Sequence, residues 1–289
     1  VDLNDFATFM PEGLSLTGQV NGYAKASWAK GQKPNLDARL VTRNGTIGLD
    51  AEDPQYEASK INYQEVAVLA KSVPQGLNLR LDVKGQDHSD HGGVGYADMV
   101  IDPYSADKKL SGEVAFSKID LKIIKPFIQD VRSIAGQLSF AGKINGTLTK
   151  PTINGGLRLT NGAIRMTSLP VDLTNIQMYA DIRQNQATIT TGFNSGRGAG
   201  TLNGRASWYD QPSIELKLKG QDLSIRQPPS IRAFVSPDID ITVKPQQRNI
   251  TVSGDIQIPR ALISMPEASA AVVNVSPDVR VIRQGRHQS

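Results

Sequence analysis

The chain has 289 residues and no cysteine, which excludes disulfides, cysteine-ligated zinc and thiol nucleophiles. Its 32 basic and 28 acidic residues leave a net charge of +4 and alternate along the chain, so the basic stripe typical of nucleic-acid-binding proteins is missing. With 26 glycines and 16 prolines but only 6% aromatic residues, the composition predicts many turns and few large side chains to fill a core. The chain starts at Val1 without a methionine or a recognisable signal peptide, and we interpret it as a piece of a longer protein.

The N-terminal third is predicted to begin with a short helix over residues 5–10, with Phe6 and Phe9 on one face. Strands are predicted to follow it, because aliphatic and polar residues then alternate with a period of two. The clearest run of alternating aliphatic residues here is Leu77, Leu79, Leu81 and Val83.

The middle third is predicted to contain the best helix of the chain, over residues 124–134. Pro126 suits its first turn and Gly136 suits its C-terminal cap. The strands predicted after it carry Leu138, Phe140, Leu157 and Leu159 as their apolar residues.

The last third repeats the alternation and adds a third short helix, predicted over residues 230–235. Its strands have one aliphatic and one charged side, which is typical of an antiparallel sheet with one solvent-exposed face. The aliphatic residues of these strands are Ile214, Leu216, Leu218, Ile239, Ile241, Val243, Ile250, Val252, Ile256 and Ile258.

Asn-Gly pairs occur six times and favour two-residue hairpins, because both residues tolerate a positive φ. Bulges and longer loops are the alternative at some of them. The six pairs are at residues 21–22, 44–45, 145–146, 154–155, 161–162 and 203–204.

Internal repeats predict an elongated object rather than a compact globule. LSLTGQVNG at residues 14–22 matches LSFAGKING at 138–146, and a degenerate third copy begins at Ile250. We divide the chain into units 1–118, 119–221 and 222–289, which form one continuous module.

The ordered set of an apolar helix, L-x-[LF]-x-G-x-[VI]-N-G and P-x-[LI]-[DN]-[AG]-x-L resembles the TamB/AsmA-like family of Gram-negative bacteria. The resemblance covers essentially the whole chain and is nearest to the C-terminal periplasmic region of the TamB members. It implies a mostly β fold, an elongated antiparallel sheet curved into a half-pipe, or β-taco, with an apolar interior groove and two or three short helices. The eighteen aliphatic residues given above, from Leu77 to Ile258, are then expected to line that groove.

The resemblance also implies a function and partners. The full protein would be anchored in the inner membrane, cross the periplasm and meet the outer-membrane barrel TamA. It would carry phospholipid acyl chains and support outer-membrane protein assembly, with unfolded outer-membrane proteins as further partners. From the resemblance we expect the membrane anchor and the extreme C-terminal segment of the family to lie outside this chain.

The residues themselves do not separate the groove from a β-sandwich, and it is the family resemblance that favours the groove. An ordinary β-sandwich would show the same aliphatic runs, and a sheet edge could capture unfolded strands by β-augmentation without transporting lipid. A sugar-binding sandwich would need clustered aromatics, for which Trp28 and Trp208 are the one candidate pair.

No enzyme, cofactor or metal site is expected. The metal-like cluster at residues 87–91 lies in a glycine-rich stretch, where a solvated loop is the default. The glycine-rich residues 192–200 lie between strands rather than before a helix, so we expect a hairpin and not a phosphate loop.

Overall fold

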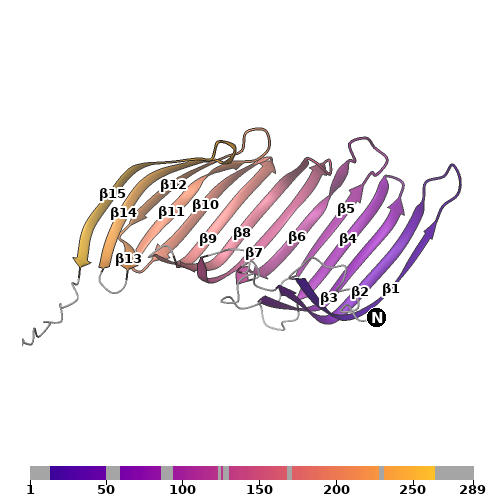
Figure 1. The fold of residues 1–289 in the computed structure, drawn as a ribbon, viewed down its shortest axis with the longest axis horizontal. Helices are drawn as coiled ribbons and strands as arrows, with labels where there is room; N and C mark the ends of the chain where they lie inside the picture. The colour runs from indigo at the N-terminus through magenta and orange to yellow at the C-terminus, as the bar shows by residue number, and fades with distance from the viewer. Residues whose placement is uncertain are drawn as a thin grey trace, which may run out of the picture.

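The computed structural model describes residues 14–49, 59–85, 94–122, 125, 130–167, 171–227 and 231–263. These residues form one open antiparallel sheet of fifteen strands, and Figure 1 shows the strands side by side in chain order. The strands are β1 (Leu14–Ser27), β2 (Asn35–Leu49), β3 (Ser59–Val73), β4 (Gly76–Gly85), β5 (Val94–Ile101), β6 (Leu110–Asp120), β7 (Val131–Gly146), β8 (Pro151–Met166), β9 (Asp172–Gln184), β10 (Gln186–Ser195), β11 (Gly198–Ser207), β12 (Ser213–Gln221), β13 (Leu223–Gln227), β14 (Ile231–Lys244) and β15 (Asn249–Ile263).

The topology is a meander, since each strand from β1 to β12 pairs with its neighbour in sequence. The strands β12 and β13 both pair with β14 and act as one bent strand, broken at Asp222, whose φ is 51°. Each of β1 and β15 pairs with one neighbour only, so the sheet has two long edges and is not closed.

Two small groups of buried residues lie near the ends of strands. In the first, Leu121 and the first residues of β7, Val131 and Ile134, pack together, and Val131 is 1% exposed. In the second, Leu223 of β13 covers Gly220, and Ser195 Oγ donates a 3.0 Å hydrogen bond to the carbonyl of Ser224. An isolated bridge joins Ile225 of β13 to Val171, the residue before β9.

The helix predicted over 124–134 is wrong for its described C-terminal part, because Val131–Gly146 is strand β7. A bulge between Val131 and Ser133 adds one residue, so Val131 and Ile134 face the same cluster although they are three apart. A spacing of three residues is also typical of one face of a helix, and the sequence pattern therefore favours a helix here. The rest of this helix lies largely outside the described residues, as does the helix predicted over 5–10.

The helix predicted over residues 230–235 is also wrong, because β14 begins at Ile231. This segment pairs with β13 on one side and β15 on the other, so ladder hydrogen bonds outweigh its weak helical pattern. The one helical element with described bounds is a 3₁₀ turn, η3 (Pro245–Gln247).

The hairpin interpretation of the Asn-Gly pairs is wrong for five of the six, which lie inside strands, whereas residues 145–146 end β7. Asn44 and Asn161 have positive φ, and the β8–β9 register shifts beside Asn161. At Gly22 and Gly204 the opposite strand is so close that a Cβ would overlap its backbone. Asn-Gly therefore permits bulges and close strand approach here, rather than turns.

Candidate functional site

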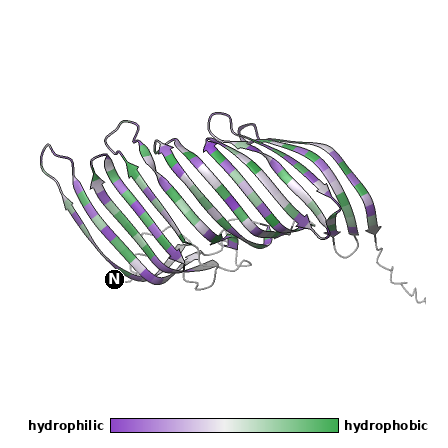
Figure 2. Ribbon diagram, turned by 180° about the vertical axis from the view of Figure 1, so that it is seen from behind, coloured by the Kyte–Doolittle hydropathy of each residue, from purple (hydrophilic) through white to green (hydrophobic). Residues whose placement is uncertain are grey.

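All eighteen residues expected to line the groove lie on one face of the sheet. Residues directly opposed in an antiparallel pair point to the same side, and the face can therefore be followed from strand to strand by the register. Leu81 opposes Ala97, Phe140 opposes Leu157, and Leu216 opposes Ile241. We call this side the aliphatic face. Figure 2 shows the resulting alternation of apolar and polar residues along each strand.

One row of this face crosses the sheet from β1 to β15 without a polar side chain. Each member opposes the next in the register of neighbouring strands. The row is Gly22, Leu40, Val68, Leu81, Ala97, Val114, Gly142, Gly155, Ile182, Ala187, Ala206, Ile214, Val243 and Ile250.

The aliphatic face is largely uncovered in the described part of the chain. Ile250 is 69% exposed and Val252 60%, and Leu40 and Leu81 are also exposed. A large exposed apolar surface of this kind marks a binding surface.

One end of the sheet is formed by seven strand connections, along the upper edge in Figure 1. We call them the hairpin rim: residues 28–34, 74–75, 102–109, 147–150, 185, 208–212 and 245–248.

Contacts between neighbouring connections and strand ends join much of the hairpin rim. Lys33 Nζ lies 4.9 Å from the ring centroid of Tyr104. The amide of Leu148 donates to the carbonyl of Lys108 at 3.2 Å. Further along, Trp208 N donates to Asn185 O at 3.0 Å, Tyr209 Oη to Pro151 O at 3.0 Å, and Gln246 Nε2 to Asp210 O at 3.4 Å.

The face opposite the aliphatic one, the charged face, carries ion pairs between strands. Lys217 Nζ lies 3.0 Å from Asp238 and 3.1 Å from Asp240. The hydrogen bond from Lys217 holds the pKa of Asp238 below its ordinary value, and the two carboxylates raise the pKa of Lys217. Similarly, Arg43 lowers the pKa of Glu65 by donating a 2.8 Å hydrogen bond. The charged face is therefore suited to contact with solvent.

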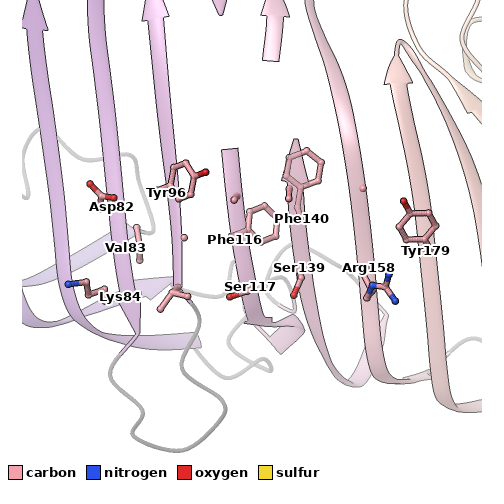
Figure 3. Close-up of a pocket in the computed structure, with 15 residues that line it drawn as sticks. Asp82, Val83, Lys84, Tyr96, Phe116, Ser117, Ser139, Phe140, Arg158 and Tyr179 are labelled. Atoms are coloured by element: carbon pink, nitrogen blue, oxygen red, sulfur yellow. The ribbon is translucent and has the colours of Figure 1, made fainter. Parts of the chain in front are cut away.

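The charged face also has a hollow of about 720 Å³ that sequence reasoning missed. Ala115, Ala141 and Gly156 oppose one another in register and line it, and Tyr96 and Tyr179 lie at its two sides (Figure 3). Three small residues on three different strands share no local pattern, so no single stretch of sequence predicts the hollow.

Two further motifs remain from the sequence. The metal-like cluster at 87–91 lies outside the described residues. The glycine-rich residues 192–200 form the β10–β11 hairpin, as expected.

Comparisons with known proteins identify the family. The family described as "TamB, N-terminal domain" matches residues 1–159, more than half of the chain. The chain belongs to the TamB family. A second TamB family model, "TamB C-terminal domain", matches residues 184–289, so the resemblance inferred from the repeats is confirmed.

One curated TamB relative is "Translocation and assembly module subunit TamB" of Haemophilus influenzae, 23% identical over 287 residues. The match covers 99% of this chain but only 21% of that relative, so the chain spans about a fifth of its length. No solved structure matches this TamB chain significantly. Among its described residues, no helix has the length and apolarity needed to cross a bilayer.

Proposed function

We propose that this chain is a periplasmic segment of a translocation and assembly module protein and that its aliphatic face forms a groove for phospholipid acyl chains. The full protein would bridge the inner and outer membranes, meet TamA at the outer membrane and support outer-membrane protein assembly. The chain would act as a conduit and not as an enzyme. The observation that carries this proposal is the unbroken aliphatic row from Gly22 to Ile250.

The energetics favour acyl chains as the ligand. Each CH₂ moved from water to an apolar surface contributes about 0.8 kcal/mol. The row contains no hydrogen-bond donor side chain that could fix a polar ligand, whereas its residues continue across fourteen strands. A long, chemically uniform ligand suits such a surface better than a small polar one.

Charge placed on the aliphatic face should abolish lipid binding. Leu79→Asp and Leu216→Arg each bring an ion where an acyl chain would lie, and burying that ion costs several kcal/mol. Native mass spectrometry of the purified chain should then find bound phospholipid in the unaltered protein and little in either variant. Thr188→Asp and Glu215→Arg, on the charged face, are the matched controls and should keep their lipid.

Photo-crosslinkers at positions 79 and 216 provide a second measurement. Capture of phospholipid at both positions supports the groove. If the purified protein carries no lipid and neither crosslinker captures any, the proposal is wrong.

A second candidate function is a strand-capturing scaffold for unfolded outer-membrane proteins. The observation that favours it is that each of β1 and β15 pairs on one side only, which leaves backbone groups for an added strand. Proline substitutions along β15 should abolish peptide capture and spare lipid binding, whereas Leu216→Arg should do the reverse.

A further inference from the structure

The two ends of the strands differ in how far the aliphatic face is open. At the hairpin rim the face reaches the last residues of the strands, such as Ile101 of β5, Val243 of β14 and Ile250 of β15. At the other end Leu121 packs beside Leu159, and Leu223 lies over Gly220. At the rim Leu110, which opposes Ile101, is buried, but the aliphatic face is covered more extensively at the opposite end.

Four aromatic residues, including both tryptophans, lie on the hairpin rim. Trp28 and Trp208, the two tryptophans of the chain, both lie there, and Tyr104 and Tyr209 join them. Trp28 is 78% exposed. Tryptophan and tyrosine are the residues that favour the boundary between hydrocarbon and water, because their rings are apolar at one end and polar at the other.

The hairpin rim also has an excess of positive charge. It contains three acidic residues, Asp102, Asp107 and Asp210, and six basic ones: Lys30, Lys33, Lys108, Lys109, Lys150 and Arg248. The amino-acid sequences that join the strands at their other ends hold eight acidic and three basic residues. Phosphate groups are thus attracted to one end of the strands.

We propose that the hairpin rim binds the phosphate groups of anionic glycerophospholipids, whose acyl chains lie on the aliphatic face and point toward the covered end. This inference rests on the proposed function and adds a fixed lipid orientation and a head-group preference. Lysines reach the phosphates, and the aromatic rings lie at the level where the hydrocarbon begins. The covered end requires no polar partner, because only the terminal methyl groups of the acyl chains would reach it.

Tryptophan fluorescence tests the orientation without an added label on the protein. We would use two phosphatidylglycerols, one with a nitroxide on the head group and one with a nitroxide near the end of an acyl chain. The head-group label should quench Trp28 and Trp208 more strongly than the chain-end label. In a Trp28→Phe, Trp208→Phe, Met178→Trp variant, whose probe lies deeper on the aliphatic face, the order should reverse.

The outcomes separate this inference from the proposed function. Stronger quenching of Trp28 and Trp208 by the chain-end label overturns the orientation but leaves lipid binding intact. Absence of quenching by either label in both proteins, with no lipid found by mass spectrometry, overturns both.

Charge removal tests the head-group preference. Lys30→Gln, Lys108→Gln and Lys150→Gln together should weaken phosphatidylglycerol binding by about fivefold per lysine and leave phosphatidylcholine binding nearly unchanged. The matched control is Lys122→Gln, Arg132→Gln, Arg226→Gln, which removes the same charge from exposed residues at the other end of the strands. Equal losses in the two triple variants, or no loss in the first, overturn the preference.

Discussion

The hydroxyl of Tyr63 on β3 donates a 2.7 Å hydrogen bond to the backbone carbonyl of Thr17 on β1, across the whole width of β2. It also lies 2.9 Å from Thr42 Oγ1 of β2. The ring is 2% exposed, and Gly45 leaves room for it because a Cβ there would overlap the ring. One side chain thus ties the edge strand β1 to the second strand inward.

Tyr63→Phe should loosen β1. Removal of the hydroxyl leaves the Thr17 carbonyl without this donor, and a lost buried hydrogen bond costs about 1–2 kcal/mol. Hydrogen exchange should show reduced protection of β1 amides with little change beyond β4. Tyr104→Phe, at an exposed ring of the hairpin rim, is the control and should leave β1 protection unchanged. Equal protection in the Tyr63→Phe variant and the unaltered protein would show that the bond does not hold the edge.

Leu223→Ala should loosen β13 where it packs over the end of β12. Leu223 is buried over Gly220, and truncation of a buried leucine costs about 2–5 kcal/mol. We expect a lower urea midpoint and faster amide exchange in β13. Leu202→Ala, at a half-buried residue of the same face, should lower the midpoint less. A larger effect at Leu202 would contradict the packing described for β13.

The alternation of aliphatic and polar residues was enough to predict an antiparallel sheet and to choose residues that share one face. Leu79 and Ile241 lie nine strands apart in the order of the sheet, and local alternation alone assigns both to the same face. The bulges were not predictable, since a residue added between Val131 and Ser133 imitates helical spacing. Some contacts join distant segments, such as Lys33 with Tyr104 or Val171 with Ile225. They depend on how the sheet is arranged in space, so no sequence pattern near these residues predicts them. The division into units 1–118, 119–221 and 222–289 stays a prediction.

Lys217→Gln should raise the pKa of Asp238. In the folded chain the hydrogen bond from Lys217 holds this pKa below its ordinary value of 3.8. A depressed carboxyl pKa stabilises the folded state above the ordinary value, and this stabilisation is lost as the pH falls through the folded pKa. Carboxyl resonances of Asp238 followed by NMR between about pH 5 and 2 should therefore titrate at higher pH in the variant.

The matched control for this titration is Lys143→Gln, on the charged face but on β7, six strands away from β14 in the sheet order. It removes the same charge and should leave the Asp238 titration where it is in the unaltered protein. High salt should reduce the difference between Lys217→Gln and the unaltered protein, because both partners are exposed. An unchanged Asp238 titration in Lys217→Gln would show that the pair is not formed in solution.

Charge on β15 should reduce self-association of the isolated chain. β15 is a fifteen-residue edge strand whose Ile250, Val252, Ile256 and Ile258 are all exposed, and long apolar edges pair with one another. Sedimentation velocity over a range of concentrations should show association of the unaltered chain. Val252→Lys and Ile256→Lys together should shift it toward monomer, because lysines facing each other across a new strand pair repel. Thr251→Lys and Ser253→Lys add the same charge to the same strand on the charged face, and this pair should have a smaller effect, because it leaves the apolar contact intact. Equal effects of the two double variants would mean that net charge, and not the aliphatic edge, controls association.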